Sequence, residues 1–196
     1  MLTIQDVLET NQMIQKNNLD VRTITMGISL LDCCSSDGKT LCRNIYDKIT
    51  SYGEHLVETG NAIGAEFGVP IINKRVSVTP ISLVAGASDL KNYVEVAKTL
   101  DKAAKEIGID FIGGFSALVE RGFTDGDRRL IDSIAESLAC TDLVCSYVAV
   151  GSTKAGINMD AVAQMGRIVK CCAEYTKDDN CLGAAKLVVF CNAPED

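Results

Sequence analysis

The chain lacks the residue patterns that point most directly to a metal or a cofactor. It has a single histidine, His55, and none of its nine cysteines forms a Cys-x-x-Cys pair. Structural zinc sites usually take two ligands from one such short loop, so the sequence argues against a zinc site. We expect no metal and no bound cofactor, and we expect the thiols to behave as small apolar groups in a reducing compartment. Metal or redox chemistry is the less favoured alternative.

The chain also lacks an excess of basic residues and a long apolar run. Its formal net charge is −7 and its pI is about 4.8, whereas proteins that bind nucleic acid usually carry a basic surface that neutralises phosphates. No apolar run reaches the length of a membrane span. The first residues include Asp6 and Glu9 and do not resemble a secretory signal. We therefore expect a cytoplasmic protein that binds neither nucleic acid nor membrane.

What the chain does have is a regular alternation of apolar runs and segments with helical spacing. Helical spacing or helix-end residues mark five segments, the first opening at Thr3 and the others at 39–67, 89–107, 124–138 and 158–174. Short apolar runs mark five expected strands, at 21–31, 69–78, 109–112, 143–150 and 186–192. Strands separated by helices favour right-handed crossovers and a parallel sheet. The sequence predicts one α/β domain over residues 1–196, with a mostly parallel five-stranded sheet and crossover helices.

The strand expected at 69–78 is unusually polar for a buried strand. Alternate residues of a strand face opposite sides, so Asn73, Arg75, Ser77 and Thr79 share one face and Lys74 lies on the other. The first strand has the same pattern, with hydroxyl and glycine positions on one face, at Thr23, Thr25, Gly27 and Ser29. If these strands are neighbours, their polar faces form one wall, as inside a barrel. This wall is a candidate ligand site, or else a polar network with a purely structural role.

Ligands of parallel α/β proteins usually bind at the carboxyl ends of the strands. The residues expected there are small or polar, and they are Asp32, Thr79, Gly113, Gly114, Ser116, Gly151, Ser152, Thr153, Lys154 and Asn192. The segment from Gly151 to Lys154 lacks the spacing of a phosphate-binding P-loop. It is either an anion site or a tight turn whose hydroxyls bind the backbone. Asp32 is the one carboxylate of this set that could act as a general base.

Four segments resemble one family closely. Residues 21–28, 73–82, 110–118 and 151–159 are similar to the microbial proteins called "PFL family protein", which carry domain of unknown function 711. The resemblance covers essentially the whole chain, but members of that family are more than twice as long. This chain resembles their N-terminal part. The resemblance implies one half of a ten-stranded β/α barrel like that of pyruvate formate-lyase.

The resemblance implies a fold, but the family has no established activity that could be inferred for this chain. Glycyl-radical chemistry is not implied, because nothing in the chain resembles the radical glycine loop of pyruvate formate-lyase. The resemblance also implies that another polypeptide covers the half-barrel, because exposed sheet edges and apolar faces tend to associate. The expected partners are a second copy of the chain, a separate half-barrel chain, and a regulatory ACT-domain protein of the kind encoded beside family members.

Three functions remain open at this point. The chain could be an enzyme, or half of one, that acts on a small anionic metabolite held by Arg75 and Lys154. It could bind the same ligand as a sensor without catalysis. It could also be a structural half-barrel that works with a partner chain.

Overall fold

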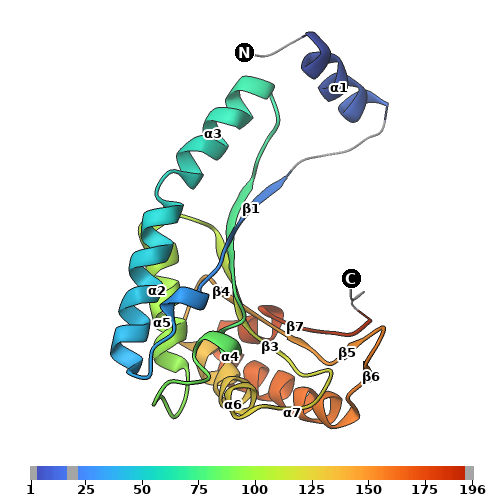
Figure 1. The fold of residues 1–196 in the computed structure, drawn as a ribbon. Helices are drawn as coiled ribbons and strands as arrows, with labels where there is room; N and C mark the ends of the chain where they lie inside the picture. The colour runs from blue at the N-terminus through green and yellow to red at the C-terminus, as the bar shows by residue number, and fades with distance from the viewer. Residues whose placement is uncertain (1–3, 17–21, 193–196) are drawn as a thin grey trace.

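The computed structural model describes residues 4–16 and 22–192 of the chain. Its first helix, α1 (Ile4–Gln15), lies apart from the rest of the molecule (Figure 1). Three of its apolar side chains, those of Ile4, Val7 and Leu8, are exposed. None of the helices in the described ranges is long and apolar enough to cross a membrane.

The main sheet has five parallel strands, as the sequence predicted. They are β1 (Thr23–Ile28), β2 (Asn73–Val78), β3 (Phe111–Leu118), β4 (Val144–Ala149) and β7 (Leu187–Phe190). Their order in the sheet is β1-β2-β3-β4-β7, which is also their order along the chain, and each neighbouring pair is parallel. Each crossover therefore moves one position in the same direction. Because crossovers of this kind are right-handed, their helices collect on one side of the sheet.

The observed helices follow this rule. The longer ones are α2 (Gly38–Gly53), α3 (Leu56–Phe67), α5 (Val94–Ile107), α6 (Asp125–Ala139) and α7 (Met159–Tyr175). Short turns form α4 (Ile81–Val84), α8 (Leu182–Ala185) and the 3-10 helices Leu31–Cys33 and Lys177–Asp179. Figure 1 shows α2, α5, α6 and α7 wrapped around one side of the curved sheet, with the opposite side left open. We call these the covered face and the open face.

Helix ends lie where the local sequence predicts them. Thr124 and Asp127 form a reciprocal capping box at the start of α6, and the Asn158 side chain caps α7. Gly68 and Gly108 end α3 and α5 in the left-handed conformation. The helical segment expected at 39–67 is divided after Gly53 into α2 and α3.

The core lies between the covered face and the helices. Buried strand residues such as Ile28, Val76 and Ile112 belong to one cluster with Ile45 of α2 and Leu100 of α5. Burial of these apolar side chains is the main favourable contribution to folding. The neighbouring residues on the open face are more exposed, and the predicted alternation of the first two strands is confirmed.

The strand β3 contains an irregularity that the sequence did not predict. Its pairing with β4 shifts register between Ile112 and Phe115, which is the signature of a β-bulge. Gly114 lies inside this step with φ of 114°. A Cβ atom at this residue would lie 2.5 Å from the Val78 carbonyl oxygen. The bulge therefore requires glycine for both its backbone conformation and its contact with β2.

We expect Gly114→Ala to lower the free energy of unfolding by at least about 2 kcal/mol, because it combines backbone strain with a close contact. Gly113→Ala is the matched control, since a Cβ at Gly113 meets no atom within 4 Å. Urea denaturation monitored by circular dichroism measures both. Equal stability of the two variants would contradict this role of Gly114.

Candidate functional site

A hollow of about 460 Å³ opens on the open face of the sheet. We call it the sheet hollow. It is lined by residues of β1 to β4 together with α8 and Lys186, namely Thr25, Arg75, Val76, Ser77, Phe111, Gly113, Cys145, Leu182, Ala185 and Lys186. No Asp, Glu or His is among these residues, so the charged groups of the hollow are cationic.

Strand register explains why these side chains meet. Arg75 pairs with Thr25 on one side and with Phe111 on the other, so the three form one row across the sheet. Ser77 and Gly113 are paired in the next row on the same face. The predicted neighbours Thr25, Arg75 and Ser77 are thus brought together at the middle of the sheet rather than at its carboxyl edge.

Arg75 is the unusual group in this hollow. Its guanidinium carbon lies 5.4 Å from the centre of the Phe111 ring, which is a cation–π arrangement. Its Nε atom is buried and has no hydrogen-bond partner. Within residues 4–16 and 22–192, no acceptor lies within hydrogen-bond distance of this Nε atom. A buried donor without an acceptor is costly, so the hollow lacks an acceptor that would complete it.

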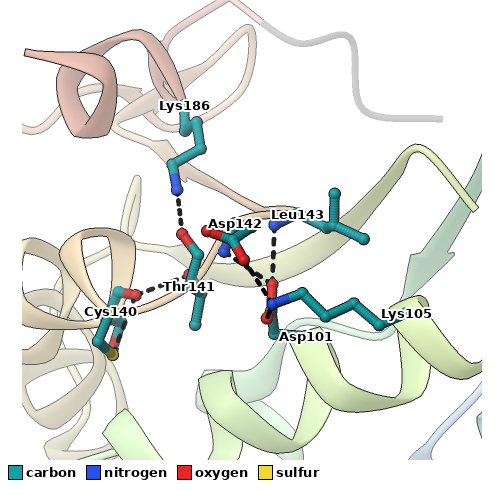
Figure 2. Close-up of polar contacts among 8 residues, drawn as sticks. Asp101, Lys105, Cys140, Thr141, Asp142, Leu143 and Lys186 are labelled. Carbon is teal, nitrogen blue, oxygen red and sulfur yellow. Dashed lines mark hydrogen bonds and ion pairs between the residues drawn. The ribbon is translucent and has the colours of Figure 1, made fainter. Parts of the chain in front are cut away.

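The other charged group of the sheet hollow, the Lys186 amino group, already has a hydrogen-bond partner in the protein. Lys186 is buried, and its Nζ donates a hydrogen bond to the Thr141 carbonyl oxygen (Figure 2). Burial also raises the pKa of the Cys145 thiol, so this cysteine is a poor nucleophile near neutral pH. Arg75 therefore remains the group best placed to receive an anion.

A carboxylate on α5 holds the beginning of β4, the strand that carries Cys145. The Asp101 Oδ1 atom accepts hydrogen bonds from the backbone N–H groups of Asp142 at 2.9 Å and Leu143 at 2.8 Å. Its Oδ2 atom lies 2.7 Å from Lys105 Nζ, which also contacts the Asp142 carboxylate (Figure 2). The hydrogen bonds that Lys105 donates to both carboxylates raise the pKa of its amino group, and the hydrogen bond from Lys105 lowers the pKa of Asp142. This network is structural.

Three other predicted residues bind the backbone. Asn73 begins β2, where its backbone N–H donates to the Arg22 carbonyl. The Thr79 hydroxyl accepts a hydrogen bond from the Leu30 N–H at 3.0 Å, which ties the ends of β1 and β2 together. Ser116 is fully buried and donates to the Gly114 carbonyl at 3.1 Å. None of the three lines the sheet hollow.

Asp32, the candidate general base, lies outside the sheet hollow. It is in the 3-10 helix Leu31–Cys33, its carboxylate is exposed, and its Oδ1 atom forms an ion pair with Lys48 Nζ. The hydrogen bond from Lys48 lowers the pKa of Asp32, which weakens it as a base.

The residues from Gly151 to Lys154 belong to a small hairpin, Gly151–Ile157, at the carboxyl edge. β5 (Gly151–Ser152) pairs antiparallel with β6 (Gly156–Ile157), and the Ser152 hydroxyl accepts a hydrogen bond from the Ala155 N–H at 3.1 Å. This fits the alternative of a tight turn with a hydroxyl bound to the backbone. Thr153 is exposed in the turn, and Asn192 is exposed with φ of 63°.

Lys154 lines a second hollow of about 520 Å³. We call it the hairpin hollow, and it is lined by Glu120, Arg121, Gly122, Lys154, Ala155 and Asn158. No residue belongs to both hollows, so Arg75 and Lys154 do not share one site. No group of three or more potential metal ligands is found in the described part of the chain.

Sequence reasoning missed Phe111, Cys145 and Lys186 in the sheet hollow and Glu120 in the hairpin hollow. The parity of the strand at 143–150 places Cys145 on the open face and could have identified it. The position of Phe111 beside Arg75 depends on the register between β2 and β3. No local pattern in the sequence specifies that register.

The family model and several similar curated proteins all indicate the same family. The family model "Uncharacterised ACR (DUF711)" matches residues 12–196. A "UPF0210 protein" from Ruminiclostridium cellulolyticum is 64% identical over 191 residues, which cover 97% of this chain and 42% of that protein. Proteins of the same name from Desulforamulus reducens and Methanocorpusculum labreanum are 62% and 58% identical and are covered to 43% and 44% of their lengths. The chain thus spans less than half the length of these relatives.

We expect Asp101→Ala to lower the free energy of unfolding by roughly 2 kcal/mol or more, because it leaves two backbone N–H groups without an acceptor. Asp142→Ala removes the exposed partner of the same lysine and should cost much less. Urea denaturation at pH 7 measures both changes. If Asp142→Ala proved the more harmful, the backbone contacts of Asp101 would not be what anchors β4.

Proposed function

The chain belongs to the DUF711 family of uncharacterised proteins, and we propose that it binds a small anionic metabolite in the sheet hollow through Arg75. The observation that carries this proposal is the buried Nε of Arg75, which has no acceptor in the described residues. A carboxylate or phosphate would supply acceptors in the paired geometry that a guanidinium favours.

The neighbouring groups support an anion of modest size. The hydroxyls of Thr25 and Ser77 line the hollow beside Arg75, and they can donate hydrogen bonds to the same ligand. Phe111, Leu182 and Ala185 give the hollow an apolar part that suits a carbon skeleton. The volume of about 460 Å³ is within the range of small-molecule sites.

Binding without catalysis is the activity that these residues favour. No lining residue is a carboxylate or a histidine, and the pKa of the Cys145 thiol is raised. A general base for catalysis would therefore have to come from a second polypeptide or from the further length that the relatives possess. We propose a cytoplasmic ligand-binding half, with catalysis dependent on such a contribution.

We expect one or more small carboxylates or phosphorylated metabolites to raise the melting temperature of the chain, because a ligand of the folded state stabilises it. Arg75→Met keeps much of the side-chain volume but removes the charged donors, and it should weaken binding about 10- to 100-fold. Thermal shift and calorimetric titration against a panel of such anions measure the effect.

Lys74→Met is the matched control for this substitution. It removes a neighbouring cation that lies on the opposite face of the same strand, so binding should be unchanged. The proposal fails if no anion in the panel binds. It also fails if Arg75→Met binds the same anion as tightly as the original chain.

We also propose that the open face is covered in the assembled protein, by a second copy or by a second half-barrel. Val188 and Leu118 are large apolar side chains on this face, and they are 55% and 42% exposed. In the described part of the chain, the edge strands β1 and β7 each have one unpaired side. Exposed edges and apolar faces of this kind favour association.

We expect the isolated chain to self-associate as its concentration rises, as measured by light scattering. Val188→Asp should shift the equilibrium toward the monomer, because it places a charge in the buried interface. Leu83→Asp changes an equally exposed residue, at 55%, on α4 and should have no effect. A monomer at every concentration would contradict self-association.

A further inference from the structure

The hairpin hollow is a second candidate site, independent of Arg75. It lies where the carboxyl ends of β3 and β4 meet the N-terminus of α7. Parallel α/β proteins commonly bind ligands at this edge of the sheet. Three charged side chains line it: those of Glu120 and Arg121, which follow β3, and that of Lys154, in the turn between β5 and β6.

The frame of this hollow is fixed by Asn158. Its side-chain Nδ2 donates to the Val119 carbonyl at 2.7 Å, and its Oδ1 accepts from the Ala161 N–H at 3.2 Å. Its backbone N–H donates to the Val150 carbonyl at 2.8 Å. One residue thus links the ends of two strands to the first turn of α7. The hollow therefore has a defined shape before any ligand binds.

Glu120 has an unsatisfied oxygen in this hollow. Its Oε2 atom is buried and accepts no hydrogen bond, and no cation of the described ranges forms an ion pair with its carboxylate. A buried carboxylate oxygen without a donor is costly. A cationic or hydrogen-bonding group that enters the hollow would remove that cost.

Lys154 carries the opposite charge at the same hollow. It is exposed, and among the described residues no carboxylate lies within ion-pair distance of its amino group. Glu120 and Lys154 line one hollow of about 520 Å³ without contacting each other. The N-terminus of α7 adds positive partial charge on the side of Asn158.

We propose that the hairpin hollow binds a small zwitterion of the α-amino acid class. The ammonium group of the ligand donates to Glu120, and its carboxylate is held by Lys154 and the positive end of α7. A simple anion would leave the buried Oε2 atom of Glu120 without a donor, and a simple cation would be repelled by Lys154 and Arg121. A ligand that carries both charges matches both residues, and its binding does not depend on the sheet hollow.

The test uses the whole chain and the twenty common L-amino acids as probes, in calorimetric titration and thermal shift. For any amino acid that binds, we compare the deaminated acid and the decarboxylated amine with the same side chain. We expect each analogue to bind at least about tenfold more weakly, because each lacks one charge-assisted contact.

Two variants test which residue contacts the ammonium group of the ligand and which contacts its carboxylate. Glu120→Gln should weaken the amino acid about tenfold or more and remove its advantage over the deaminated acid. Lys154→Met should remove its advantage over the decarboxylated amine. Lys170→Met, at an exposed residue of α7, and Arg75→Met should both leave binding unchanged. The Arg75 control separates this site from the anion site.

Three results would overturn the proposal. The first is that none of the twenty amino acids binds at up to about 10 mM, well above the range of ordinary metabolite affinities. The second is that Glu120→Gln binds as tightly as the original chain. The third is that Glu120 and Lys154 form an ion pair with each other in solution and are therefore not free for a ligand. A double-mutant cycle of the free energy of unfolding, with Glu120→Gln and Lys154→Met, would reveal such a pair as a coupling energy.

Discussion

The order of the strands is the constraint on which the rest of this structure depends. Because β1, β2, β3, β4 and β7 are adjacent in chain order and all parallel, the right-handed crossovers place their helices on one face. In a doubly wound sheet the order reverses and helices cover both faces. Here the second face is left open, and its polar and cationic residues do not have to be buried under a helix. Arg75 can occupy the middle of a strand for this reason.

The two candidate sites stand out because the same residue types are satisfied elsewhere in the molecule. The Arg129 guanidinium donates to the carbonyl oxygens of Ser88, Leu90 and Gly86, each at 3.1 Å. The Asp101 carboxylate accepts two backbone hydrogen bonds and pairs with Lys105. Native proteins satisfy most buried polar groups in this way. The unpartnered atoms of Arg75 and Glu120 therefore indicate binding more strongly than their charges alone.

Patterns local to the sequence predicted five strands, most helix ends and the polar face of the first two strands. The strand expected at 109–112 was placed wrongly, since β3 runs from Phe111 to Leu118 and includes the Gly113, Gly114 and Ser116 positions expected beyond its end. The capping residues Thr124 and Asn158 and the terminal glycines Gly68 and Gly108 act within one turn, so the sequence contains their signal. The local sequence contains no such signal for the pairing of strands that are far apart in the chain. The register that places Phe111 beside Arg75, and the bulge at Gly114, depend on contacts between separate strands. Of the residues expected at the carboxyl edge, Gly113 lines the sheet hollow and Lys154 lines the hairpin hollow, and the others line neither.

The two hollows differ in how far this chain alone can complete them. The frame of the hairpin hollow comes from β3, β4, the hairpin and α7, and Asn158 holds these elements together. The sheet hollow lies on the open face, so one of its sides is whatever covers that face. A covering chain would lower the dielectric constant around Arg75 and strengthen its interaction with an anion. By linkage, the same anion would then favour the covered state. Ligand binding at Arg75 and assembly of the open face are thus expected to be coupled, whereas binding at Glu120 and Lys154 is expected to be independent of assembly.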